Sequence, residues 1–205
     1  MISDPSNRIG AAAVMMCLLC FATASASEPP TACDLLAAHP SDPDRIVDGR
    51  SQSEIMPDIE RTIATCRRDV EHDESPRLTY YLGRVLFYRG ELEEGLELVE
   101  TAAAQGHRQS QFVSALIRAN GIPDVIAADP CHARELWANA ASRGHYAATL
   151  AVARHHLGGA FADCVGDGPT TAEMHAWLET AGHYERAGDY FHGLLIGLLR
   201  EQLDD

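Results

Sequence analysis

Lysine is missing from this sequence, in which all 16 residues counted as lysine plus arginine are arginines. This absence excludes a P-loop lysine, a lysine that forms a Schiff base, and the Ser-x-x-Lys nucleophile of penicillin-recognising enzymes. The His-Glu-x-x-His motif of zinc proteases and the Gly-x-Ser-x-Gly motif of serine hydrolases are absent as well. The sequence therefore predicts no catalytic residue.

Positive charge of any kind is scarce. The 16 arginines are outnumbered by 30 aspartates and glutamates, which gives a net charge of −14. Nucleic-acid phosphates and anionic membrane surfaces both bind basic patches, so this charge balance argues against either as a partner.

Signals for β-strands are also few. From Glu54 onward there is little period-two alternation and no Asn-Gly turn, whereas apolar residues recur at helical spacing. Gly and Pro interrupt this pattern, and Asp129-Pro130 and Thr170 or Thr171 are suited to begin helices. We therefore predict an all-α fold with helices at about Glu54–Asp69, Arg77–Tyr88, Leu92–Ala104, Gln109–Asn120, Cys131–Ser142, Ala147–Leu157, Thr171–Ala181 and Ala187–Leu203.

The segment 1–26 has the pattern of a signal peptide rather than of a folded segment. Arg8 precedes a short apolar run, Ile9–Ala22, which cannot cross a bilayer core of about 30 Å. Ala24-Ser25-Ala26 then fits the small-x-small pattern that a signal peptidase cleaves. We predict cleavage after Ala26 and export to the periplasm or the medium without stable membrane insertion; an uncleaved N-terminal anchor is the alternative.

Four cysteines remain in the segment 27–205, which is long enough for one domain. An even number of cysteines in an exported chain indicates two disulfides, for which three pairings are possible. We favour Cys33 with Cys66 and Cys131 with Cys164, because the two pairs then have the same separation in the sequence. A zinc site is the alternative, but the paired Cys-x-x-Cys spacing of structural zinc is absent.

Similar segments recur along the chain. QFVSALIRANG from Gln111, TLAVARHHLGG from Thr149 and DYFHGLLIGLL from Asp189 each have a small residue four positions after their start. ARELWANAASRG and AEMHAWLETAG each place a tryptophan, Trp137 or Trp177, four residues before an alanine. A small residue lets two helices approach while the large one fills the space beside it, so the pattern indicates repeated helix pairs.

The order Gln-aromatic-x-x-small, Gly, Ala-x-x-x-Trp-x-x-x-Ala, Gly resembles the Sel-one-like repeats (SLR) of the tetratricopeptide repeat (TPR) superfamily, in their exported, cysteine-containing bacterial type. The resemblance extends from Leu78 to the C-terminus, and its first unit, with Leu82-Gly83, is closer to an ordinary TPR. The sequence departs from the family at Ser114-Ala115, where Leu-Gly is usual, and in the longer turns Ile122–Asp129 and Ala160–Pro169.

The resemblance implies an α/α-hairpin solenoid stapled by the two disulfides. Residues 27–74 would form an N-terminal cap with the first helices, and residues 75–205 the repeats, in units of 75–107, 108–145, 146–185 and a truncated 186–205.

The resemblance also implies a concave face that binds a protein or peptide through outward positions of the first helix in each pair, which here are Tyr80, Arg84, Tyr88, Phe112 and Arg154. We expect Arg84 and Arg154 to be exposed and able to bind a carboxylate. Tyr80 and Phe112 suit the groove and the core between repeats equally well.

Aspartate and histidine form no recognisable metal or cofactor motif. Asp42, Asp44 and Asp48 lack the spacing of a calcium loop and suit turns and helix caps. His155 and His156 diverge by about 100° on a helix, so they cannot hold one ion together. His156 stands where the repeat often has Tyr, so we expect it to be packed and hydrogen-bonded. We predict no metal and no cofactor.

Three Gly-His pairs, at Gly106, Gly144 and Gly182, recur at equal intervals along the sequence. The third is two residues out of register with the tryptophans, because Gly144 lies seven residues after Trp137 and Gly182 only five after Trp177. We interpret the glycines as helix stops, each followed by a residue that opens the next helix. A metal shared between the histidines is not expected, because equivalent repeats lie about 10 Å apart.

The expected function is that of an exported scaffold or adaptor that binds a protein or peptide. The alternative is a hydrolase that acts on the cell wall or on a small substrate, since cysteine-rich relatives of this repeat family have been associated with penicillin binding. A stable structural role in an assembly is a third reading.

Overall fold

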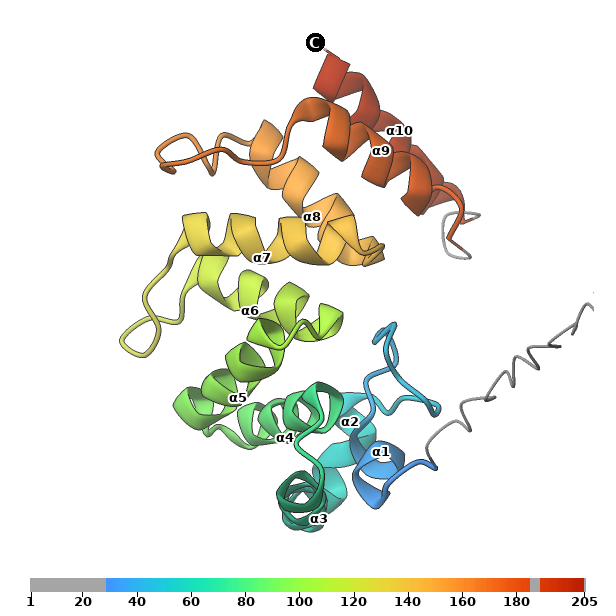
Figure 1. The fold of residues 1–205 in the computed structure, drawn as a ribbon, viewed down its shortest axis with the longest axis vertical. Coiled ribbons are helices and arrows are strands. Elements are labelled where there is room, and N and C mark those ends of the chain that lie inside the picture. Colours follow the sequence, from blue (N-terminus) through green and yellow to red (C-terminus); the bar gives the residue numbers. More distant parts are fainter. Residues whose placement is uncertain (1–28, 185–188, 205) are drawn as a thin grey trace, which may run out of the picture.

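The computed structural model describes residues 29–184 and 189–204, and the regular elements in these ranges are helices (Figure 1). They are α1 (Ala32–Ala37), α2 (Gln52–Ile55), the 3₁₀ helix η1 (Met56–Asp58), α3 (Ile59–His72), α4 (Pro76–Arg89), α5 (Leu92–Ala104), α6 (Arg108–Asn120), α7 (Pro130–Ser142), α8 (Tyr146–Leu157), α9 (Thr171–Ala181) and α10 (Tyr190–Asp204). The all-α prediction is confirmed. The predicted signal peptide and its cleavage site at Ala26 lie outside the described residues.

The helices begin where the sequence supplies a side chain that caps them. The Asp129 carboxylate accepts the His132 N–H at 2.9 Å at the start of α7, and the Thr170 hydroxyl accepts the Glu173 N–H at 3.2 Å at the start of α9. Both caps were predicted. The short helix α1 was not among the predicted helices; Thr31 caps it with a reciprocal pair of hydrogen bonds to its third residue.

From α3 to α9 each helix packs mainly on its neighbours in the sequence, so the chain rises from α3 at one end to α10 at the other (Figure 1). Within this order α4 packs most extensively on α5, and α6 on α7. The buried side chains form three successive clusters, which contain Leu86, Trp137 and Leu178 respectively. The core is therefore divided along the molecule rather than gathered in one cluster.

Two glycines set the closest approach of α4 and α5. A Cβ atom on Gly83 would lie 2.8 Å from the Gly95 carbonyl oxygen, and one on Gly95 would lie 2.8 Å from the Phe87 nitrogen. Any larger side chain at either position would push the two backbones apart. The expectation that a small residue beside Leu82 allows two helices to approach is confirmed.

Both predicted disulfides are present, and each spans 33 residues. Cys33–Cys66 joins α1 to α3 and is fully buried. Cys131–Cys164 joins the start of α7 to the long turn between α8 and α9. Arg134 holds the same turn, since its guanidinium donates to the carbonyl oxygens of Val165 at 3.1 Å and Gly166 at 3.3 Å. Disulfides of this kind are found in proteins of oxidising compartments.

Residues 39–49, which we call the N-terminal loop, connect α1 to α2 and are closed at their base. The Arg50 N–H donates to the Ala38 carbonyl at 2.8 Å. A Cβ on Gly49 would lie 2.3 Å from the Pro40 nitrogen, so only glycine fits where the two ends meet. The loop reaches the first residue of α6, where Asp44 accepts a hydrogen bond from Arg108 at 3.0 Å. It therefore brings the N-terminal cap against the middle of the helix stack.

The last helix exposes apolar side chains on its outer face. Ile196 and Leu199 of α10 are buried against the stack, whereas Phe191 is 74% exposed and Leu194 and Leu198 are each 47% exposed. The stack thus ends on an apolar face rather than a polar one. In the described ranges, no helix combines the length and the apolar character that a bilayer crossing requires.

We expect removal of either disulfide, as C33A/C66A or as C131A/C164A, to lower the free energy of unfolding by about 3–4 kcal/mol, because the two enclosed loops have equal length. The effect of C33A/C66A should be the larger, since its sulfur atoms are fully buried and their loss leaves a cavity. Guanidinium unfolding of both variants beside the parent protein measures the difference. A larger loss of stability in C131A/C164A would contradict the conclusion that Cys33–Cys66 is the better packed disulfide.

Candidate functional site

The first two Gly-His pairs form helix joints of the same design. Gly106 ends α5 with a left-handed φ of 91°, and His107 becomes the N-cap of α6, with its Nδ1 accepting the Ser110 N–H at 3.3 Å. Gly144, with a φ of 79°, and His145 repeat this arrangement between α7 and α8. The prediction that these glycines stop one helix and that the next residue opens another is confirmed.

The third pair is different, as its register predicted, and here the prediction that the residue after the glycine opens the next helix is wrong, because His183 lies in a turn. Gly182 has a φ of −62° at the end of α9, and the next helix begins only at Tyr190. The two capping histidines also have different partners, because His145 Nε2 is hydrogen-bonded to Gln109 Oε1 at 2.9 Å. The ring of His107 faces the N-terminal loop instead.

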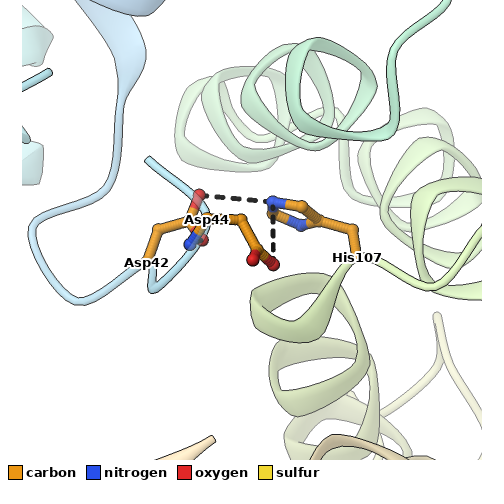
Figure 2. A group of neighbouring side chains, drawn as sticks. All are labelled: Asp42, Asp44 and His107. Carbon is orange, nitrogen blue, oxygen red and sulfur yellow. Dashed lines mark hydrogen bonds and ion pairs between the residues drawn. The ribbon is translucent and has the colours of Figure 1, made fainter. Parts of the chain in front are cut away.

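The His107 imidazole points at two carboxylates of the N-terminal loop (Figure 2). Its Nε2 lies 3.3 Å from Asp42 Oδ2 and 4.0 Å from Asp44 Oδ2. The side chain of His107 is 3% exposed, that of Asp42 is 0% exposed and that of Asp44 is 31% exposed. Nε2 is within ion-pair distance of Asp42 but is not aligned for a hydrogen bond, and in the described structure it has no hydrogen-bond partner.

Donors on other elements fix both carboxylates. Asp42 Oδ2 accepts the Tyr81 hydroxyl at 3.1 Å, and Asp42 Oδ1 accepts the Asp44 N–H at 2.8 Å. Burial, reinforced by the Asp42 carboxylate, raises the pKa of Tyr81, so its hydroxyl stays protonated as a donor. Arg108 holds Asp44 through its backbone N–H at 3.2 Å and its Nε at 3.0 Å. Burial alone would raise the pKa of Asp44, but the hydrogen bonds from Arg108 outweigh it and lower that pKa.

Asp42, Asp44 and His107 are the one group of possible metal ligands that the described residues bring together. Their ligand atoms all lie within 4.8 Å of one another. Carboxylate oxygen and imidazole nitrogen are ligands of divalent first-row metal ions. The aspartates also serve the turn that the sequence predicts, since Asp42 accepts the N–H two residues further on. We name these three residues the Asp-His cluster.

A groove of about 450 Å³ lies between the N-terminal loop and the helices α6 and α8. Proline, aromatic and aliphatic side chains make up most of its walls. The lining residues are His39, Pro40, Ser41, Pro43, Arg45, Gln109, Phe112, Val113, Leu116, His145, Tyr146, Ala147 and Tyr184.

Phe112 and His145 form the floor of this groove as a stacked pair, with ring centroids 5.0 Å apart and planes inclined by 19°. Burial lowers the pKa of His145 to about 4; the charge of Asp42 opposes this shift and that of Arg108 adds to it. At neutral pH the stacked imidazole is therefore uncharged, and it adds no positive charge to the floor.

The prediction that Arg84 is exposed is wrong. Its side chain is buried, and its residue is 4% exposed. Nη1 donates to the carbonyl oxygens of Ala37 at 2.7 Å and Ala38 at 3.0 Å, and Nη2 donates to that of Arg50 at 2.5 Å. These carbonyls end α1 and begin the segment before α2, so the guanidinium is used within the fold and is not available to a partner.

The other predicted partner-binding residues do not converge on one surface. Tyr80 is buried in the core, and Tyr88 accepts a hydrogen bond from Arg84 Nε at 2.9 Å. Phe112 lines the groove and also packs on His145, so it has both of the roles left open for it. Arg154 is exposed, as predicted, but it does not line the groove.

The structure also corrects the assignment within the adjacent histidines of α8. His156 is exposed rather than packed. His155 packs instead, with its ring centroid 4.6 Å from that of Trp137 and 6.2 Å from that of Phe161. Ala153 is buried and Arg154 is exposed, as the repeat pattern predicts, so the difference is confined to which of the two histidines packs on the core.

The sequence does not reveal the Asp-His cluster or the groove, because both depend on a contact between distant segments. Both are formed where the N-terminal loop meets α6, and Asp44 and Arg108 are 64 residues apart in the sequence. The acidic loop and the Gly-His register were visible, but neither pattern indicates which helix the loop contacts.

We expect Arg84→Lys to lower the free energy of unfolding by about 2–4 kcal/mol, because an ammonium group cannot reach three separate carbonyls and leaves some of them unsatisfied. Arg154→Lys should change it by no more than about 0.5 kcal/mol, because Arg154 is exposed. Chemical denaturation of both variants tests the contrast, and equal effects would argue against the buried role of Arg84.

We expect the free energy of unfolding to fall by about 2 kcal/mol between pH 7.5 and pH 5 through His145 alone. The pKa of His145 is about 4 in the folded protein against the usual histidine value of 6.5, so the unfolded chain binds more protons between these values. The stabilisation is complete above pH 6.5 and is lost as the pH falls toward 4. Urea unfolding at several pH values measures this slope.

The matched variants for this test are His145→Asn and His156→Asn. Asparagine is itself a good N-cap, so the first variant removes the titration and retains the helix cap. The pH dependence should become shallower in His145→Asn and stay unchanged in His156→Asn, whose imidazole is exposed. An unchanged slope in His145→Asn would show that His145 titrates normally.

Comparisons with protein-family models, with curated proteins and with solved structures find no match to this chain. The similarity to Sel-one-like repeats therefore stays a prediction from the sequence. Function is inferred from the two assemblies of side chains that the fold creates, the groove and the Asp-His cluster.

Proposed function

We propose that this protein is an exported, periplasmic or secreted, repeat protein of the Sel-one-like type that binds an extended peptide segment of a partner protein in the groove. The observation that carries the proposal is the groove itself, about 450 Å³ in volume and walled by the N-terminal loop, α6 and α8. Binding grooves are lined by apolar and aromatic side chains with a few polar groups that fix orientation, and this groove has that character.

The charge of the groove favours an occupant that carries a carboxylate. The lining contains no aspartate or glutamate, although the chain has 30 of them. Arg45 supplies the one guanidinium in the lining, and it is exposed. It donates a hydrogen bond to the Asp42 carbonyl at 2.8 Å, and no ion pair joins it to a carboxylate of the described residues. Its other donors are thus able to bind a carboxylate of a peptide.

The side chains that line the groove suit a peptide segment with apolar residues. Pro40 and Pro43 line one side, and Leu116 and Tyr184, which are 46% and 43% exposed, line it from the helical side. Apolar side chains of a peptide would pack between these walls, and Arg45 would bind a nearby acidic residue or a C-terminal carboxylate. The preferred occupant is therefore a segment with apolar residues beside a carboxylate.

The proposed location rests on two observations. The first residues have the pattern of a signal peptide, and the folded part contains two disulfides, which persist in oxidising compartments. We propose binding rather than catalysis because the sequence lacks the nucleophile motifs of hydrolases and the groove is lined by no carboxylate or cysteine.

A display library of short random peptides selected against the protein lacking residues 1–26 tests the proposal. We expect enrichment of sequences that combine aromatic or branched apolar residues with Asp, Glu or a C-terminal carboxylate. Arg45→Glu and Leu116→Glu should each weaken binding of the enriched peptides at least about tenfold, since both place a repelling charge in the groove.

The control variant is Arg154→Glu, which makes the same charge change on an exposed residue outside the groove. It should bind the peptides as the parent protein does, and circular dichroism should show all three variants folded. Selection without enrichment, or equal binding by all three variants, would contradict the assignment of the groove as the binding site.

A further inference from the structure

We propose that Asp42, Asp44 and His107 form a binding site for a divalent first-row metal ion, with Zn²⁺ the best match, at the contact between the N-terminal loop and α6 (Figure 2). This inference does not depend on what occupies the groove. It assigns a ligand to three side chains whose nitrogen and carboxylate oxygen atoms converge between the loop and α6.

The observation that points to a ligand is the unsatisfied nitrogen of His107. The side chain is 3% exposed, and its Nε2 is buried without a hydrogen-bond partner. Buried polar groups in native proteins are nearly all hydrogen-bonded, so one that is aimed at two carboxylates indicates a missing partner between them. A cation placed there would bind the nitrogen and both carboxylates together.

The spacing of the ligand atoms suits such an ion after a small adjustment. Two ligands bound to zinc at about 2.1 Å in tetrahedral geometry are about 3.4 Å apart. Nε2 and Asp42 Oδ2 are already at 3.3 Å, and Nε2 and Asp44 Oδ2 at 4.0 Å. The Asp44 side chain is partly exposed, and a shift of its carboxylate that keeps Oδ1 on the Arg108 guanidinium would bring Oδ2 in as the third ligand. A water molecule would complete the four ligands.

The second nitrogen of His107 has the partner that metal binding requires. A bound Nε2 must carry no proton, so the proton moves to Nδ1. Ser110 Oγ lies 2.9 Å from Nδ1 and can accept that hydrogen bond, which would replace the bond that Nδ1 accepts from the Ser110 N–H in this structure. Histidines that bind metals commonly donate their other N–H to such an acceptor, which fixes the ring orientation.

The charges around the cluster also favour a cation. Asp42 is fully buried, and its described hydrogen-bond donors, the Tyr81 hydroxyl and the Asp44 N–H, are uncharged. Arg108 compensates Asp44, but its guanidinium is not paired with Asp42. Apart from His107, the described residues place no basic side chain in an ion pair with Asp42, and a divalent ion would supply positive charge to this buried acidic group. The mixed oxygen and nitrogen ligands favour Zn²⁺ over Ca²⁺, which takes oxygen ligands.

Isothermal titration of ZnCl₂ into the untagged, chelator-treated protein lacking residues 1–26 tests the proposal. We expect one site per chain, and X-ray absorption at the zinc edge should show nitrogen and oxygen ligands at about 2.0–2.2 Å without sulfur. His107→Asn and Asp44→Asn should each weaken this site at least about 100-fold, because each removes a ligand.

The matched control is His145→Asn. His107 and His145 occupy equivalent N-cap positions, and asparagine preserves the cap in both, but His145 faces Gln109 rather than carboxylates. Zinc affinity should be unchanged in His145→Asn. Asp44→Asn keeps the proposal testable if His107→Asn does not fold. Absence of a saturable site, or equal zinc affinity in Asp44→Asn and the parent protein, would overturn the proposal.

Discussion

The guanidinium of Arg84 is the interaction on which the N-terminal half of the molecule depends. It donates hydrogen bonds to three backbone carbonyls, two at the end of α1 and one just before α2. These bonds join the two ends of the N-terminal loop from inside the core. Gly49 completes the closure by allowing the two ends of the loop to touch. This anchor adds to the contacts of Asp42 with Tyr81 and of Asp44 with Arg108 that hold the loop against the helices, and the groove and the Asp-His cluster both depend on the position of the loop.

The N-terminal loop contributes to both the Asp-His cluster and the groove, through different residues. Its acidic side presents Asp42 and Asp44 to His107, and its proline side, with Arg45, forms a wall of the groove. The start of α6 also contributes to both, through His107 as N-cap and Phe112 one turn further on. An ion bound by the Asp-His cluster would therefore hold one wall of the groove against the helices that form the other.

Short sequence patterns predicted most of the fold. The helices, their Gly stops, the caps at Asp129 and Thr170 and both disulfides follow from short patterns, and the structure confirms them. The candidate site was predicted poorly, with Phe112 the one proposed residue that lines the groove. The reason is physical: burial of Arg84 depends on carbonyls that are distant from it in the sequence, and helix periodicity contains no information about such a contact. The packing of His155 in place of His156 likewise depends on the contact with Trp137, which the repeat pattern does not specify.

The long separation between the N-terminal loop and its partner has a consequence for the order of folding. The helix pairs join residues that are close in the sequence, whereas Asp44 meets Arg108 across 64 residues. Contacts of large separation form late, because the entropy of closing the intervening chain must be overcome first. The N-terminal loop is thus expected to dock after α6 has formed. The groove is therefore completed late in folding, although the loop lies early in the sequence.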